Sequence, residues 1–245
     1  MRYQLGNALV RLERTAEAVE HYRRAVAMED RYAPAWINLG EAAYNLGDYE
    51  LAATALERGF RRSGEKRADV LFYAAAARLM SADAAGAAPL LEELVSGTWG
   101  EPRLDWFRAL ISACIDLGDK PRGRRAVDGL LERFGEDPEA WILAFQHAAA
   151  SGDYRRAAVD LTVAGYLRPL TREERIQLGD LYTAIGVPYA ATSWYEGAIA
   201  DGGAANEYER LASAWLAAYE VEQAKKTIRE GLDRCLLYTS PSPRD

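Results

Sequence analysis

Apolar residues recur at helical spacing in the segment PAWINLGEAAYNLGDYELAATALERGF, residues 34–60. Trp36, Leu39 and Ala43 lie three and four residues apart, which places them on one face of a helix. The Gly-Asp pair that begins at Gly47 interrupts this pattern as a turn does, and a second helical run of Ala, Leu and Phe follows. The segment therefore predicts two helices joined by a tight turn, a helical hairpin.

The same hairpin recurs along the chain with a period of 34 residues. One hairpin cannot bury its apolar face alone, so successive copies have to stack on one another. The residues that match across this period are Gly6 and Gly40, Ala18 and Ala52, Phe107 and Trp141, and Gly118, Gly152 and Gly186. The predicted repeats span about residues 1–32, 33–66, 67–102, 103–137, 138–170, 171–205 and 206–234.

The period and the pattern W-x-x-L-G…Y…A resemble the tetratricopeptide repeat family over nearly the whole chain, up to about Arg234. The resemblance implies an all-α fold, a right-handed α-solenoid of about seven helical hairpins. It also implies a scaffold that binds a protein or peptide partner in a concave groove lined by the first helices, without catalysis. The residues expected to contact that partner are Tyr3, Asn7, Arg11, Asn38, Glu41, Tyr44, Asn45, Arg108, Ser112, Gln146, Gln177 and Asp180.

The expected groove mixes acids, amides and aliphatic side chains, which suits a peptide or helix with apolar anchors and some basic groups. One subtype of the family, the carboxylate clamp for chaperone C-terminal tails, is not expected. Asn7 and Asn38 match its two asparagines, but Tyr3, Ala68 and Phe72 stand where residues that grip carboxylates are needed.

Composition limits the function classes further. Apolar residues make up 49% of the 245-residue chain, which is typical of a folded core and not of disorder. The net charge of −7 disfavours bulk binding to nucleic acid or to an anionic membrane. No apolar run reaches the roughly 18 residues that a membrane-spanning helix needs, so we expect no direct membrane insertion.

No residue pattern predicts catalysis, and we expect no catalytic, cofactor-binding or metal-binding residues. His21 and His147 lie in different repeats without a paired carboxylate or cysteine, which favours solvated or capping roles. Asp48, Asp119 and Asp153 recur at the same turn position, where Asp accepts hydrogen bonds from nearby backbone N–H groups.

Cysteine and tryptophan add two further expectations. Cys114 falls on the inward face of a predicted helix and is expected to be buried, and no disulfide framework or zinc spacing exists. Trp36 and Trp141 hold the packing position of the repeat. Trp99 lies in a predicted loop and is the best candidate among the tryptophans for an exposed contact.

The last eleven residues, CLLYTSPSPRD from Cys235 to Asp245, resemble the translated read-through of a sequencing adapter. We interpret them as a non-native tail, with Cys235 to Tyr238 extending the last helix before disorder begins. On this interpretation the chain is a fragment of a longer bacterial protein, and its uncapped ends could support self-association.

Two alternative functions stay open beside the scaffold. The repeats could be the regulatory or substrate-recruiting arm of a larger enzyme, such as a glycosyltransferase. The segments TREERIQLGDLY and GVPYAA, from Thr171 onward, resemble repeat proteins encoded beside energy-transducing systems of the Gram-negative envelope, which implies a periplasmic accessory protein. The sequence leaves the compartment open between cytoplasm and periplasm.

Overall fold

The computed structural model describes residues 1–200 and 203–239. Within these ranges the chain forms fourteen α-helices and no β-strand, which confirms the all-α fold predicted from the repeat. The helices belong to two compact units, an N-terminal unit (Met1–Leu130) and a C-terminal unit (Leu131–Asp245).

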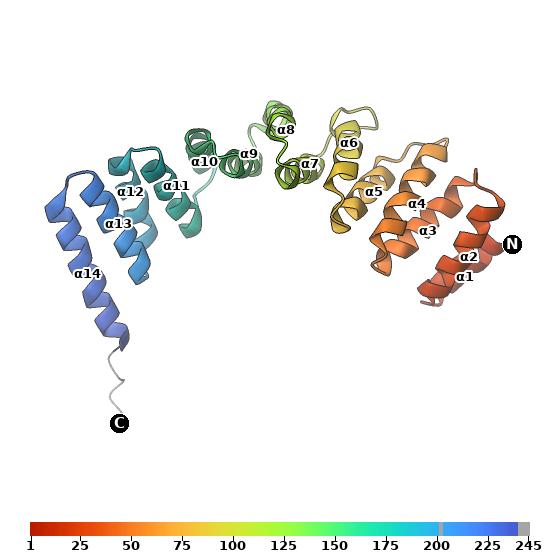
Figure 1. The fold of residues 1–245 in the computed structure, drawn as a ribbon, viewed down its shortest axis with the longest axis horizontal. Helices are drawn as coiled ribbons and strands as arrows, with labels where there is room; N and C mark the ends of the chain where they lie inside the picture. Colours follow the sequence, from red (N-terminus) through yellow and green to blue (C-terminus); the bar gives the residue numbers. More distant parts are fainter. Residues whose placement is uncertain (201–202, 240–245) are drawn as a thin grey trace, which may run out of the picture. The chain divides into compact units, whose positions relative to one another are not determined.

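The N-terminal unit consists of consecutive antiparallel helical hairpins (Figure 1). From α1 to α7 each helix packs on the next along the chain, and α5 also contacts α3 and α7. First helices of successive hairpins therefore lie side by side. The helices of this unit are α1 (Arg2–Arg11), α2 (Thr15–Met28), α3 (Ala33–Asn45), α4 (Tyr49–Arg62), α5 (Ala68–Met80), α6 (Ala84–Val95), α7 (Leu104–Leu117) and most of α8 (Lys120–Phe134).

The C-terminal unit repeats the same hairpin arrangement. Helix α14 continues to Thr239 through residues of the tail that were expected to extend it, and the disorder expected for the remaining tail lies outside the described residues. The helices of this unit are α9 (Pro138–Ala150), α10 (Tyr154–Leu167), α11 (Arg172–Ala184), α12 (Pro188–Ile199), α13 (Ala205–Ala217) and α14 (Val221–Thr239).

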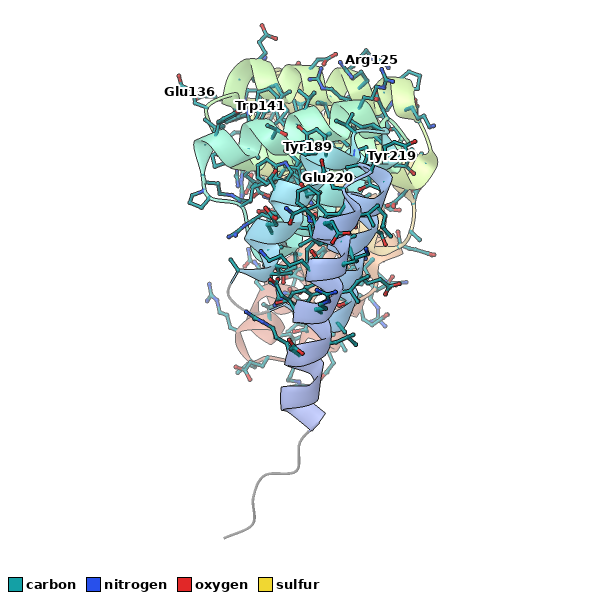
Figure 2. All side chains as sticks on the ribbon, turned by 90° about the vertical axis from the view of Figure 1, so that its left-hand side faces the viewer. Arg125, Glu136, Trp141, Tyr189, Tyr219 and Glu220 are labelled. Atoms are coloured by element: carbon teal, nitrogen blue, oxygen red, sulfur yellow. The ribbon has the colours of Figure 1, made fainter. Side chains whose placement is uncertain are left out.

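Every one of the seven hairpin turns contains one residue with positive φ. In four turns that residue is glycine, which adopts this conformation without steric cost; they are Gly47, Gly118, Gly152 and Gly186. In the other three turns it is Glu13, Ala82 or Tyr219, at φ of 59°, 60° and 64°. Figure 2 shows Tyr219 and Glu220 at the start of α14. The turn geometry is therefore kept even where the glycine is not.

Aspartates after these turns cap the second helices. Asp48 Oδ1 accepts a hydrogen bond from the Leu51 N–H at 3.2 Å, and Asp153 Oδ1 accepts one from the Arg156 N–H at 3.1 Å. Asp119 caps α8 in the same way. The turn role expected for these aspartates is confirmed, because a side-chain oxygen at this position satisfies a backbone donor that the helix leaves unpaired.

Alanines, leucines and a few aromatic residues form the core between the layers of helices. In the first two hairpins, Tyr22, Trp36 and Leu39 are buried, as are the alanines that face them. Small residues allow the helices to approach closely, and full burial of each large side chain contributes about 1.5–3 kcal/mol. Cys114 is buried as expected, and burial raises the pKa of its thiol to about 11.

Candidate partner-binding surface

One position recurs on the first helices of several hairpins, and we call it the polar position. In α1, α3 and α11 it directly follows a glycine: Asn7 after Gly6, Glu41 after Gly40, and Asp180 after Gly179. The repeat period places Ser112 of α7 and Gln146 of α9 at the same position. All five side chains are exposed or half-buried, whereas α5 carries the buried Ala75 there. The five residues give the first helices a polar face in each unit.

In the first hairpin the polar position belongs to a neutral hydrogen-bond network. The Tyr22 hydroxyl of α2 donates to Asn7 Oδ1 at 2.7 Å, and Asn38 Nδ2 of α3 donates to the same oxygen at 2.9 Å. The Asn38 amide also lies 3.3 Å from the Tyr3 hydroxyl. Burial raises the pKa of Tyr22, so its hydroxyl stays protonated as the donor. The network connects the first helices of two successive hairpins.

The glycine before the polar position makes room for the tyrosine. A Cβ added at Gly6 would lie 2.5 Å from Tyr22 Cε1, and one added at Gly179 would lie 2.5 Å from Tyr195 Cε1. Real side chains do not approach this closely, so glycine is required for the close approach of the ring in both hairpins.

In the sixth hairpin the polar position is ionic. The Tyr195 hydroxyl of α12 donates to Asp180 Oδ1 at 2.7 Å, and the Arg210 guanidinium of α13 forms an ion pair with Asp180 Oδ2. Burial raises the pKa of Tyr195 to about 12. These residues line a depression of about 550 Å³, together with Thr183, Ala184, Asn206, Glu209, Ser213 and Ala214.

The second hairpin has the glycine and the acid but lacks the tyrosine. Leu56 occupies the place of Tyr22 and Tyr195, fifteen residues after Glu41, and it packs against Gly40. No residue that the structure describes donates a hydrogen bond to the Glu41 carboxylate or forms an ion pair with it. The consequence is a depression of about 420 Å³, the Glu41 pocket, lined by Glu41, Tyr44, Asn45, Leu56 and Tyr73.

Aromatic rings form the wall of the Glu41 pocket. The ring centroid of Tyr44 in α3 lies 6.1 Å from that of Tyr73 in α5 and 5.3 Å from that of Tyr49 in α4, both in edge-to-face geometry. Tyr73 is 51% exposed, so part of its ring remains free for a partner.

The electrostatics of the pocket are set by Glu41 and two charged neighbours. Glu41 as a residue is accessible, but its carboxyl lies against protein on the pocket side, and this desolvation raises its pKa. The positive charge of Arg67 partly offsets that rise, and the negative charge of Asp69 adds to it. Arg67 is itself bound to Asp69, with Nη2 2.6 Å from Oδ2. The Glu41 charge is therefore not neutralised by a direct partner.

The structure brings the predicted partner-binding residues together in groups. Tyr3, Asn7 and Asn38 form the first network, while Glu41, Tyr44 and Asn45 share the pocket. Asp180 lies in the ionic site of the C-terminal unit. The remaining predicted residues are exposed along the first helices, and they are Arg11, Arg108, Ser112, Gln146 and Gln177.

Tyr22, Tyr73 and Tyr195 belong to these sites but were not among the residues predicted to contact a partner. A sequence signal for Tyr195 exists, because the spacing of fifteen residues from Asn7 to Tyr22 recurs from Asp180 to Tyr195. Tyr73 lies on the next first helix after Glu41, so finding it requires knowledge of which residues face one another across the hairpins.

Two other expectations are corrected. Trp99 is half-buried and not an exposed contact, because its ring packs edge-to-face on Phe60 at 5.3 Å and its Nε1–H donates to Glu93 at 3.1 Å. His147 is buried in the last turn of α9 and is not solvated, while His21 is half-buried. Among the described residues, no group of three or more His, Cys, Asp or Glu side chains could hold a metal ion.

The described helices include none that is long and apolar enough to cross a lipid bilayer.

Comparison with known proteins shows what the chain is similar to. The tetratricopeptide repeat family model matches residues 3–63, which contain the first two hairpins. No curated protein matches the chain.

Several solved structures share the fold. The C-terminal part of a repeat-containing protein from Cytophaga hutchinsonii aligns over 95% of this chain and 98% of its own, at 16% identity and a TM-score of 0.63. A tetratricopeptide repeat protein from Parabacteroides merdae aligns over 95% and 91%, at 16% identity and a TM-score of 0.55. A structure of Naa15/Naa10 bound to HypK-THB aligns over 95% of this chain and 36% of its own, at 11% identity and a TM-score of 0.63.

Proposed function

We propose that this chain is a non-catalytic scaffold that holds a peptide or protein partner on the polar face of its first helices, as the tetratricopeptide repeat match over residues 3–63 and the shared fold support. The fold in general is that of protein–protein interaction scaffolds. The partner class and the face are our proposal, and they follow from the side chains that the first helices leave accessible.

The observation that carries this proposal is the polar position. Five first helices expose an amide, a hydroxyl or a carboxylate at one equivalent place, although burial of the repeats does not require a polar side chain there. Such groups offer hydrogen bonds to the backbone and side chains of an extended or helical segment. Acids and amides dominate, so the face favours a partner that presents hydrogen-bond donors and basic groups.

Selection of peptides from a random displayed library against the full chain tests the proposal. Peptides that bind the first-helix face should lose about tenfold in affinity when Ser112 or Gln146 is replaced by arginine, because the added side chain covers the face. Val159→Arg on α10 is the matched control, since Val159 is exposed at 54% on a second helix. Equal losses for Val159→Arg and Gln146→Arg, or a loss for Val159→Arg alone, would contradict the proposal.

A further inference from the structure

The Glu41 carboxylate lacks the partners that acceptors at the polar position have elsewhere. Asn7 accepts from Tyr22 and Asn38, and Asp180 accepts from Tyr195 and Arg210. Leu56 cannot donate a hydrogen bond to Glu41. An acceptor that is partly desolvated and has no donor favours a ligand that supplies one.

The next first helix does not supply the missing donor either. Asn38 follows Asn7 by 31 residues and Arg210 follows Asp180 by 30, and both reach back to the polar position. The corresponding residues after Glu41 are Leu71, which is buried, and the half-buried Phe72. Neither side chain can neutralise a carboxylate.

The sixth hairpin shows which group satisfies an acid at this position. The guanidinium of Arg210 binds Asp180 from the neighbouring helix. Arginine presents several N–H donors in a planar fork that matches a carboxylate, and its plane also stacks on aromatic rings.

The walls of the Glu41 pocket fit the same group. Tyr44 and Tyr73 place two aromatic rings beside the acid, and cations bind favourably over such rings. The Asn45 side chain adds a polar group at the rim. Arg67, the nearby cation, is engaged with Asp69. The pocket is thus acidic, aromatic and without an internal cation bound to Glu41.

We propose that the Glu41 pocket receives an arginine side chain of the protein partner, with its guanidinium on the Glu41 carboxylate and against the exposed part of the Tyr73 ring, beside Tyr44. The inference rests on the proposed scaffold function and adds the chemistry of one anchor residue. The partner arginine takes the part at Glu41 that Arg210 takes at Asp180.

Titration of the full chain with L-argininamide tests this directly. The probe should produce saturable NMR shifts of the Glu41 carboxyl carbon and of the Tyr44 and Tyr73 ring signals. Glu41→Gln preserves the shape and removes the charge, so the affinity should fall by roughly five- to tenfold. L-norleucinamide, which has no side-chain charge, should leave these signals unchanged. Absence of saturable shifts, or equal affinity in Glu41→Gln, would overturn the proposal.

A second variant tests the origin of the pocket without changing charge. Leu56→Tyr restores the tyrosine of the first and sixth hairpins, and Gly40 leaves the space next to residue 56 that Gly6 leaves for Tyr22. The new hydroxyl should donate to one Glu41 oxygen, and its ring should fill part of the pocket that Leu56 lines. L-argininamide should therefore bind more weakly without being excluded, since Tyr195 and Arg210 bind Asp180 together. Circular dichroism establishes that the variant folds, and Glu41→Gln remains decisive if it does not. A folded Leu56→Tyr variant that binds L-argininamide as the parent does would contradict the inference.

The two proposals fail in different ways. Selected peptides that bind the first-helix face while L-argininamide leaves the Glu41 pocket unchanged would end this inference and keep the scaffold function. L-argininamide bound at Glu41, with all selected peptides on the second helices, would end the scaffold proposal on the first-helix face.

Discussion

The sixth and second hairpins have the same backbone arrangement at the polar position but differ in whether the acid there has hydrogen-bond and ion-pair partners. In the sixth, Asp180 is held by the Tyr195 hydroxyl and the Arg210 guanidinium. In the second, Glu41 follows the same kind of glycine but faces Leu56, and its carboxylate has no direct partner among the described residues. Two replacements account for the difference: Leu56 stands in place of the tyrosine on the second helix, and Leu71 and Phe72 stand where the next first helix would supply a donor.

The first hairpin supports the comparison with a neutral version. Asn7 takes the place of the acid, and Tyr22 and Asn38 supply its donors. The glycine and the tyrosine therefore form a structural pair that does not depend on charge. Charge enters only where the polar position is an acid, and there it requires a cation from within the protein or from a partner.

The largest expected effect concerns the glycine of this pair. Gly179→Ala places a methyl group 2.5 Å from the Tyr195 ring and should destabilise the fold, whereas Gly129→Ala in α8 meets Phe107 at an ordinary 3.5 Å. Overpacking costs about 1–3 kcal/mol, and alanine gains up to about 1 kcal/mol in a helix. Because the helix gain is common to both variants, we expect them to differ by roughly 1–3 kcal/mol, the overpacking cost, in urea unfolding. Equal stabilities of the two variants would show that the Tyr195 ring moves aside freely, so that the Gly179–Tyr195 pair imposes no packing constraint.

The next effect is a loss of stability in alkali that depends on Tyr195. Its pKa is about 12 in the folded protein, mainly because of burial, compared with about 10 for an exposed tyrosine. Because the folded pKa is raised, this stabilisation is fully present below pH 10 and is lost as the pH rises from about 10 to about 12. The loss should reach roughly 2 kcal/mol.

Thermal unfolding across this pH range measures the effect, with Tyr195→Phe as the control. The phenylalanine variant should lose less stability over the same range. Parallel pH profiles for the two proteins would mean that Tyr195 titrates in the folded state as an exposed tyrosine does.

A smaller effect is expected at neutral pH when one hydroxyl is removed. Tyr195→Phe deletes the donor to Asp180 Oδ1 and should cost about 1 kcal/mol, because Asp180 is partly exposed and water replaces part of the bond. Tyr22→Phe should cost about as much or less, since Asn38 still donates to Asn7. Urea unfolding of both variants compares the ionic and neutral networks. A loss of stability in Tyr22→Phe well above that in Tyr195→Phe would contradict this expectation.

The smallest effect on stability is expected for Arg210→Ala. The Asp180–Arg210 pair is about two-fifths exposed on each side, and exposed pairs contribute about 0.2–1 kcal/mol. The variant also gives a second readout, because removal of Arg210 leaves Asp180 with the Tyr195 hydroxyl on Oδ1 and with Oδ2 open to an added guanidinium. L-argininamide should then shift the Asp180 carboxyl signal, which it should leave unchanged in the parent protein. A shift of equal size in both proteins would break the analogy between the two acids.

Much of the fold can be predicted from the sequence because the same helical-hairpin pattern recurs in successive repeats. The period of 34 residues, the turn glycines and the aspartates at Asp48, Asp119 and Asp153 all predict hairpins, and the structure has helices and caps where they indicate. Local spacing is sufficient for these features, since helices and turns depend on residues within a few positions of one another.

The candidate site follows from the sequence only in part. The first-helix residues Asn7, Glu41 and Asp180 can be found by spacing alone. The recurring spacing of fifteen residues also indicates Tyr195, whereas Tyr73 cannot be found in this way because its contact depends on which side chains meet between helices. Trp99 illustrates the same limit, since it was the best candidate among the tryptophans for an exposed contact and instead packs on Phe60 from an earlier hairpin. Packing across hairpins, not local pattern, decides these cases.

The central claim is that a partner binds the first-helix face. Cross-saturation from a selected, protonated peptide to the amide groups of the deuterated full chain measures this most directly. We expect the strongest intensity losses on the first helices of the hairpins, which are the odd-numbered ones, around Glu41 in the N-terminal unit or Gln146 in the C-terminal unit. Losses concentrated on the even-numbered helices, such as those around Val159 of α10, would contradict it.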